Sequence, residues 1–240
     1  DWVANHTAHD NHLVYQHPEW FSRDSLGNLI SPFDWSDVVQ LDYTNDDMRE
    51  YMIGALKFWV EEANIDGYRC DVASEIPVDF WEEGRRRLEK IRSDIIMLSE
   101  GERAQDQLYA FDMSYAFLWI NTTIKVMDDD LPAFELQNVW HKMNKEFPEG
   151  ARFIRAYDTH DVASDRGENR FERSWSNNGV DAVLFMNFTM DGVPFLYNGT
   201  EVADSVIHNL WANRHTGHNY IVDWSNSLTK SGRERCDLVK

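Results

Sequence analysis

The sequence has few cysteines, few basic residues and no long apolar run. Its two cysteines, Cys70 and Cys236, lie far apart and match no metal-binding spacing, so they form no disulfide framework and indicate no cellular compartment. No apolar stretch approaches the length of a membrane-spanning helix. Because 42 acidic residues outnumber 23 lysines and arginines, giving a net charge of −19, we expect neither a nucleic-acid nor an anionic-membrane partner, since both need basic patches.

Aromatic residues, by contrast, are plentiful. They make up 13% of the 240 residues, with 10 tryptophans, and 42% of the chain is hydrophobic, which is enough for a substantial core. We expect core packing for most of the tryptophans. The chain opens on DWVANH (Asp1–His6) without an initiator methionine or a signal peptide, and we expect it to be a fragment of a longer protein.

The first part of the chain combines a turn-rich segment with a helix. Residues 7–43 are polar, aromatic and punctuated by turn signals, which predicts an excursion with little regular structure. At Thr44–Asp47 a capping residue is followed by acids suited to the positive end of a helix dipole. A helix is predicted from there to about Glu62, with apolar residues at helical spacing: Met48, Tyr51, Met52, Ala55, Phe58 and Trp59.

Downstream, short apolar runs alternate with helical patterns. We predict strands in residues 67–71, 94–100, 109–115, 151–161 and 192–199, and helices near 77–90, 116–127, 131–146 and 181–190. Such alternation predicts a parallel α/β arrangement. Strand after strand ends in polar or charged residues, which is the habit of the (β/α)₈ barrel, although doubly wound sheets share it in part.

Charged residues stand at the ends of three predicted strands. Arg69 and Asp71, two residues apart, share one face of a strand, and they either form a structural ion pair or line a site. Asp71 and Glu100 end two strands, and Asp161 follows a third. Carboxylates that lie close together at one end of a barrel repel each other, so that their pKa values differ. One of them can then be a protonated acid while another is an ionised nucleophile. Retaining glycoside cleavage needs such a pair ~5–5.5 Å apart, but acidic strand ends also occur as solvated surface, and both interpretations stay open.

Five segments, in the right order, resemble motifs of the α-amylase family of glycoside hydrolases (family 13), which are (β/α)₈-barrel enzymes. DWVANH (Asp1–His6) is similar to the first motif, Asp-x-x-x-Asn-His at the end of the third barrel strand. The others are GYRCDVASE (67–75) for the second motif, SEGE (99–102) for the third, AYDTHD (156–161) for the fourth and GVPFLYNGTE (192–201) for the eighth-strand motif.

The resemblance implies a (β/α)₈ TIM-barrel-type fold that is incomplete in this chain, with about strands 4–8 present. Residues 1–6 would end the third strand, residues 7–43 would form a short excursion in place of the family's B domain, and residues 44–240 would be the remainder of the barrel. We expect the missing strands to come from another chain, from a swapped partner in an oligomer, or from residues outside this sequence, because about five strands cannot close the barrel.

The resemblance also implies roles for individual residues. Asp71 would be the nucleophile, Glu100 the acid/base, and Asp161 a ligand of the ring hydroxyls that binds more tightly in the transition state. Arg69 would orient Asp71, with Asp1 beneath. His6 and His160 would bind the sugar, although a lone histidine is more often structural. Aromatic residues of the excursion could stack on sugar or simply pack: Tyr15, Trp20 and Trp35.

Departures from the family pattern affect specificity and metal binding. Ser74 and Glu75 stand where many relatives have Lys-His, which bind the acceptor-side sugar, so we expect acceptor specificity to depend on them. Asn5 matches the family's calcium ligand in the first motif, but Gln40 replaces a calcium-binding aspartate. We therefore expect no required cofactor, with calcium as a candidate ion and Asn5 as its candidate ligand.

The resulting hypothesis is a retaining hydrolase of α-1,4-glucosidic bonds in starch, glycogen or maltooligosaccharides, acting through a covalent glycosyl-enzyme. Two alternatives remain. One is a transglycosylase of the same family, which passes the glycosyl unit to a sugar hydroxyl, and the other is a catalytically silent, truncated barrel or carbohydrate-binding remnant. The sequence does not distinguish these alternatives, nor does it determine the linkage or chain length preferred.

Overall fold

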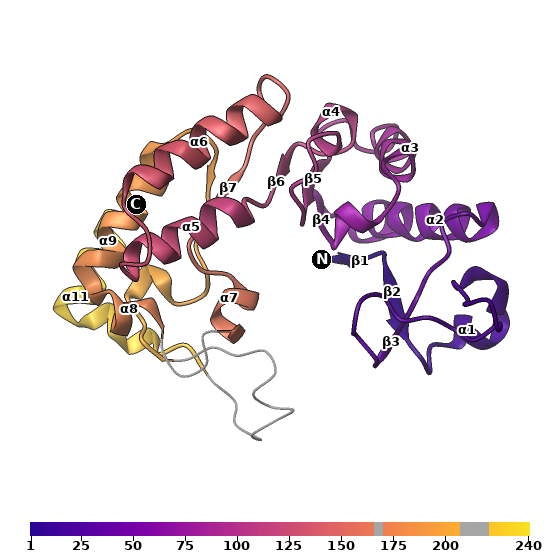
Figure 1. The fold of residues 1–240 in the computed structure, drawn as a ribbon, viewed down its shortest axis with the longest axis horizontal. Coiled ribbons are helices and arrows are strands. Elements are labelled where there is room, and N and C mark those ends of the chain that lie inside the picture. The colour runs from indigo at the N-terminus through magenta and orange to yellow at the C-terminus, as the bar shows by residue number, and fades with distance from the viewer. Residues whose placement is uncertain (166–169, 207–220) are drawn as a thin grey trace. The chain divides into compact units, whose positions relative to one another are not determined.

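The computed structural model describes residues 1–165, 170–206 and 221–240. They form two compact units (Figure 1): an N-terminal unit of residues 1–115 with 146–151, and a C-terminal unit of residues 116–145 with 152–240. This division concerns packing, and the domain boundaries predicted after residues 6 and 43 stay predictions. Within the described ranges, no helix combines the length and the apolar character needed to cross a membrane.

The N-terminal unit is built on a parallel sheet of four short strands in the order β1-β4-β5-β6. Val3 lies opposite Asp71, and Cys70 lies opposite Ser99. Because the strands are parallel, the residues that follow β4 and β5 meet at one edge of the sheet, and the predicted parallel α/β arrangement is confirmed here. Its strands are β1 (Trp2–Val3), β4 (Gly67–Asp71), β5 (Ile96–Ser99) and β6 (Met113–Ser114), connected through α2 (Asp46–Ala63), α3 (Val78–Leu88) and α4 (Asp106–Tyr109).

Helix α2 begins where the capping pattern predicts. The side chain of Asn45 accepts a hydrogen bond from the Met48 N–H at 3.0 Å, and two aspartates occupy the first turn, near the positive end of the helix dipole. Asn64 ends the helix in the left-handed conformation that commonly terminates helices. The start and end of this helix are thus local consequences of the sequence.

The predicted apolar face of α2 is partly wrong. Tyr51, Phe58 and Trp59 are exposed. The buried face is a row of residues four apart, from Met48 to Val60 with Leu56 inside it, because residues at this spacing line up along one side of a helix. Ile53 lies beside this row and is also buried. The buried residues of α2 are Met48, Met52, Ile53, Leu56 and Val60.

The segment predicted as an excursion holds more regular structure than expected. Strand β2 (His6–Ala8) pairs antiparallel with β3 (Val38–Gln40), and a short helix α1 (His12–Gln16) is followed by a 3₁₀ turn, η1 (Pro18–Trp20). Trp20 is buried, stacks on the His17 ring with centroids 3.9 Å apart, and belongs to the same apolar core as residues of β4 and α2. Core packing therefore accounts for Trp20.

The C-terminal unit contains a parallel pair of strands, β7 (Ile154–Arg155) and β8 (Val193–Pro194). The predicted strand of residues 151–161 is much shorter in the structure, and its last two residues begin a helix instead. The three predicted helices are present, one of them starting five residues early: α5 (Phe117–Met127), α6 (Phe134–Glu146) and α9 (Ser176–Thr189). Elements not predicted are α7 (His160–Asp165), α8 (Phe171–Ser174), η3 (Thr200–Val202), η4 (Trp224–Leu228) and α11 (Lys230–Leu238).

Buried charge attaches α11 to the rest of this unit. Arg235 of α11 is buried, forms an ion pair with the buried Glu172 of α8 at 3.2 Å, and donates to the carbonyl of Thr200 at 3.0 Å. It also contacts Asp181 of α9. These charge-assisted bonds, rather than an apolar stripe, hold the last helix in place.

Candidate active site

Strand β4 separates apolar and charged side chains onto its two faces. Tyr68 and Cys70 are buried in the core of the N-terminal unit, whereas Arg69 and Asp71 lie on the opposite face and are partly accessible. This alternation follows from the two-residue repeat of a strand. The two charged residues therefore share one face, as their spacing predicts.

Arg69 contacts three carboxylates at the edge of the sheet. Its Nη1 donates to Oδ1 of Asp71 at 2.6 Å and to Oδ1 of Asp1 at 2.9 Å, and its Nη2 donates to Oε1 of Glu100. The guanidinium carbon lies 5.5 Å from the centre of the Tyr115 ring. Burial lowers the pKa of Arg69, but the charge of Glu100 and hydrogen bonds with Asp71 and Tyr115 outweigh it and raise that pKa above its ordinary value. Arg69 is thus a fixed cation among acids.

Glu100, directly after β5, is held from the side of β4. Its Oε2 accepts from the Val72 N–H at 2.8 Å. Its backbone N–H donates to the carbonyl of Cys70 at 2.9 Å, and its carbonyl accepts from the Ala73 N–H at 3.1 Å. Each carboxylate oxygen of Glu100 therefore accepts a hydrogen bond from a residue of β4 or of the turn after it.

The backbone is strained between Asp71 and the following turn. Val72 adopts the left-handed conformation, with φ 46° and ψ 37°. A β-branched residue is an outlier there, and such a conformation costs about 1–3 kcal/mol. The bend directs the Val72 N–H to Glu100. The strained residue therefore directly follows one candidate catalytic carboxylate, Asp71, and hydrogen-bonds the other, Glu100.

His6, at the start of β2, is a partly buried imidazole near this site. Its ring packs edge-on against Trp35, with centroids 5.3 Å apart, and its Nδ1 is buried without a hydrogen-bond partner among the described residues. Burial lowers the pKa of His6, while the charges of Asp71 and Asp37 oppose that effect. A neutral imidazole can donate one hydrogen bond and accept another, which suits recognition of a hydroxyl group.

The chain with His6→Gln should lose less folding stability than the unsubstituted chain when the pH falls below neutral. Because the pKa of His6 is lowered in the folded state from 6.5, the unfolded chain takes up a proton first as the pH falls, and the folded state loses stability. We expect the urea midpoint to fall more for the unsubstituted chain than for His6→Gln between about pH 7.5 and about pH 5.5. His12→Gln, which removes an exposed imidazole, is the control. Parallel pH profiles for the chain and His6→Gln would contradict the assignment.

Two further candidate residues, His160 and Asp161, lie in the C-terminal unit. His160 and Asp161 occupy the first turn of α7, and Nε2 of His160 lies 3.3 Å from Oδ2 of Asp161. Both side chains are partly exposed. The two residues before them, Asp158 and Thr159, are buried, and Oδ2 of Asp158 accepts from Nη2 of Arg170 at 3.3 Å. The structure thus brings together Arg69 with Asp71, Glu100 and Asp1 in one unit, and His160 with Asp161 in the other.

A family model described as "Alpha amylase, catalytic domain" matches residues 1–233. The chain belongs to this family. The resemblance carried by the five motifs is therefore confirmed.

Relatives of known name include several amylases of this family. A maltogenic alpha-amylase of Bacillus acidopullulyticus is 27% identical over 172 residues, which cover 66% of this chain and 27% of that protein. A solved maltogenic alpha-amylase of Thermotoga neapolitana is 32% identical, with a TM-score of 0.80 over 99% of this chain and 53% of that one. A solved alpha-amylase of Lactobacillus plantarum is 26% identical, with a TM-score of 0.73 over 97% of this chain and 57% of that one.

The solved relatives imply a (β/α)₈ TIM-barrel-type fold, so this part of the fold prediction is confirmed. The chain spans only about a quarter of the maltogenic alpha-amylase of Bacillus acidopullulyticus and about half of each of the two solved relatives. Its predicted incompleteness is not tested by these matches.

Ser74 and Glu75, where this alpha-amylase family member departs from the second motif, lie in a 3₁₀ turn, η2 (Ala73–Glu75), directly after the strained Val72. Ser74 is partly buried, whereas Glu75 is exposed. Both residues follow closely on Asp71 in the chain. Their role in acceptor binding stays a prediction.

Calcium binding at Asn5 stays a prediction. Calcium takes six to eight oxygen ligands, usually with several carboxylates. Asn5 is buried, its backbone carbonyl accepts from the Leu41 N–H at 3.1 Å, and Gln40 lies opposite His6 in the neighbouring strand. Within residues 1–115 no three acidic, histidine or cysteine side chains converge as metal ligands would. We therefore derive no catalytic step through calcium.

Sequence reasoning did not single out two residues of this site, Tyr115 and Arg103. Tyr115 follows β6 in the same way that Glu100 follows β5, so a rule for strand ends that included aromatic residues would have found it. Arg103 stands three residues before Asp106, the first residue of α4, and the two side chains form an ion pair. An Arg-x-x-Asp pattern a few residues after β5 is the signal that was available.

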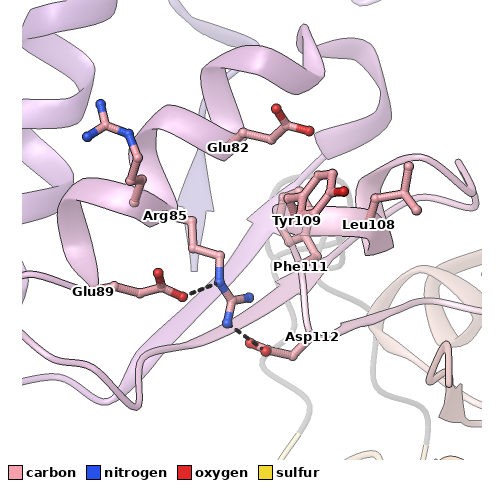
Figure 2. Close-up of a pocket in the computed structure, with 8 residues that line it drawn as sticks. Glu82, Arg85, Glu89, Leu108, Tyr109, Phe111 and Asp112 are labelled. Atoms are coloured by element: carbon pink, nitrogen blue, oxygen red, sulfur yellow. Dashed lines mark hydrogen bonds and ion pairs between the residues drawn. The ribbon is translucent and has the colours of Figure 1, made fainter.

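A separate hollow of about 560 Å³ lies between α3 and α4 of the N-terminal unit (Figure 2). In its wall Arg85 donates to Glu89 and to Asp112, both at 2.8 Å, and Tyr109 lies exposed at its edge. It contains none of the predicted site residues, and the charges of Arg85 are already paired. The candidate active site is therefore the strand edge around Arg69 and not this hollow.

Proposed function

We propose that the chain carries catalytic machinery of a retaining glycoside hydrolase that cleaves α-1,4-glucosidic bonds of starch, glycogen or maltooligosaccharides. The observation that carries this proposal is the contact of one guanidinium, that of Arg69, with both Asp71 and Glu100. Two carboxylates bridged by a single guanidinium fit the separation of ~5–5.5 Å used by retaining enzymes better than the ~6.5–9.5 Å of inverting ones.

In the proposed reaction Asp71 attacks the anomeric carbon and forms a covalent glycosyl-enzyme. Arg69 donates to Asp71 and so favours the ionised carboxylate that attacks. Glu100 gives its proton to the leaving glycosidic oxygen, and then takes a proton from the water that releases the sugar. The proton that leaves Glu100 in the first half is thus restored in the second, and Asp71 is regenerated as a carboxylate.

The sugar-binding roles rest on the family motifs and on the character of the side chains. Asp161 would accept hydrogen bonds from ring hydroxyls that strengthen as the ring flattens, which lowers the barrier because the transition state is bound more tightly than the substrate. The neutral imidazole of His6 would bind a hydroxyl of the same sugar, with His160 as a second ligand. Both side chains are partly exposed in the first turn of α7, as contact with a sugar would require.

We also propose that the parallel strands of this chain are the third to eighth strands of a barrel. In support of this, β1 pairs in parallel with β4 at one edge of the β1-β4-β5-β6 sheet, and β7 pairs in parallel with β8. In this arrangement residues outside the 240 would supply the first two strands, and residues 7–43 would take the place of the B domain. The solved relatives, of which this chain covers 53% and 57%, leave room for such residues.

A transglycosylase is the second candidate, and one relative favours it. A 1,4-alpha-glucan branching enzyme of Fusobacterium nucleatum is 23% identical over 150 residues, and branching transfers a glycosyl unit to a sugar hydroxyl. Against it, other relatives bear the names maltogenic amylase and cyclomaltodextrinase. Both candidates share the covalent step at Asp71 and differ only in the acceptor.

Product analysis tests the proposal and separates these candidates. With a maltooligosaccharide substrate we expect short products whose new reducing ends are first seen as the α-anomer by proton NMR, because two inversions restore the configuration. A β-anomer would rule out the retaining mechanism. Products longer than the substrate, increasing when maltose is added as acceptor, would identify the transglycosylase. Binding of the oligosaccharide without any turnover would point to the silent remnant.

A further inference from the structure

The turn that follows Val72 is bound by Arg103, and the indole N–H of Trp81 also donates to one of its carbonyls, that of Ala73, at 3.0 Å. Nη1 of Arg103 donates to the carbonyl of Ser74 at 2.9 Å, and Nη2 donates to the carbonyls of Ile76 at 2.9 Å and Ala73 at 3.5 Å. The guanidinium of arginine has several N–H donors in a fixed fork, so one side chain can bind several backbone carbonyls at once. Arg103 therefore ties three peptide groups of one turn to one point.

Asp106 holds Arg103 in turn. Oδ1 of Asp106 accepts from Nε of Arg103 at 2.7 Å, and the Asp106 side chain is fully buried. Its Oδ2 accepts from the hydroxyl of Ser99 at 3.5 Å, and Ser99 is the residue before Glu100. The clamp is thus anchored on the strand that delivers the proposed acid.

Close packing leaves this turn little freedom. A Cβ added to Gly101 would lie 2.9 Å from Cβ of Ser74, so the segment after Glu100 touches the turn after Asp71. Val72 lies between these contacts in its left-handed conformation, which persists only where surrounding structure holds it. The hydrogen bonds of Arg103 to the three following carbonyls are such a restraint.

We propose that Arg103 is a positioning residue for Glu100, acting through the backbone of Val72 and Ala73. When the clamp is lost, the strained turn relaxes, and the Val72 and Ala73 N–H groups no longer hold the carboxylate and carbonyl of Glu100. The role given to Glu100 rests on the proposed function. The coupling between Arg103 and the turn does not.

Leaving-group dependence tests the effect on the acid. The leaving oxygen of a maltooligosaccharide needs a proton, whereas dinitrophenolate leaves without one. Because small misplacements of a catalytic group cost up to about 10²-fold, we expect Arg103→Met to lower kcat/KM for a maltooligosaccharide by about 10²-fold. With a dinitrophenyl α-maltooligosaccharide the loss should stay below about threefold. Equal losses with both substrates, or no loss with either, overturn the proposal.

Two further variants sharpen this comparison. Arg86→Met removes an exposed arginine of α3 that pairs with Glu83, and it should change neither rate. Because Arg103→Met leaves a buried carboxylate without its cation, the double variant with Asp106→Asn is measured beside it. The double variant should show the same selective loss, and it keeps the test open if the single variant does not fold.

Backbone amide exchange tests the coupling without any substrate. We expect the amides of Val72 and Ala73 to exchange about tenfold faster or more in the Arg103 variants, because their hydrogen bonds open more often. In Arg86→Met their exchange should not change. Unchanged exchange in the Arg103 variants overturns the positioning role. Faster exchange in a chain that hydrolyses nothing would uphold the coupling and reject the proposed function, so the two failures are distinguishable.

Discussion

Asp71→Asn should reduce the rate of maltooligosaccharide cleavage on the order of 10⁴-fold, because an amide cannot form the glycosyl-enzyme and removal of a catalytic nucleophile has effects of this size. The substitution keeps the shape of the side chain. Arg69 retains its contacts with Asp1 and Glu100, so we expect the fold to survive. The measurement is the initial rate of release of reducing ends.

The control for this prediction is Asp79→Asn. Asp79 is an exposed residue of α3 that forms an ion pair with Arg49 of α2. Exposed ion pairs contribute little, so its rate should match that of the unsubstituted chain. If Asp71→Asn kept more than about a tenth of the activity, Asp71 would not be the nucleophile.

The fold was predictable where local chemistry decides it. Asn45 with the acids after it predicts the start of α2, and the alternation in β4 predicts which side chains face the core. Helix α11 was missed because its main anchor is the buried Arg235, and an arginine in a polar stretch indicates a solvated helix or a loop. Residues 160–161 were assigned to a strand because nothing in their pattern marks where β7 ends.

The candidate site was predictable to a similar degree. The rule that polar residues at parallel strand ends meet at one edge anticipates the contacts among Arg69, Asp71 and Glu100. It does not anticipate the left-handed Val72, since a β-branched residue argues against that conformation. The spacing of Arg103 and Asp106 signals their ion pair, but it does not reveal that Arg103 binds backbone carbonyls of the turn after Val72, because carbonyls leave no trace in a side-chain pattern. Both features depend on tertiary contacts.

Arg69→Met should both destabilise the N-terminal unit and impair cleavage. The substitution leaves Asp1, Asp71 and Glu100 at one edge without their shared cation. Removing one partner of a buried charge pair costs about 3–5 kcal/mol, and we expect about 3 kcal/mol because the site is partly accessible to solvent. With Asp71 no longer oriented, kcat should fall by about 10²-fold.

The stability deficit of Arg69→Met should shrink as the pH falls. Repulsion among the carboxylates makes the folded variant take up a proton at a higher pH than its unfolded chain does, so its stability rises relative to the unsubstituted chain on acidification. Urea midpoints at about pH 7.5 and about pH 5 measure this. Arg69→Lys keeps the charge but lacks the fork, so it should recover stability without recovering kcat. Arg86→Met should change neither. A deficit that is constant with pH would mean that Arg69 acts through packing rather than through charge.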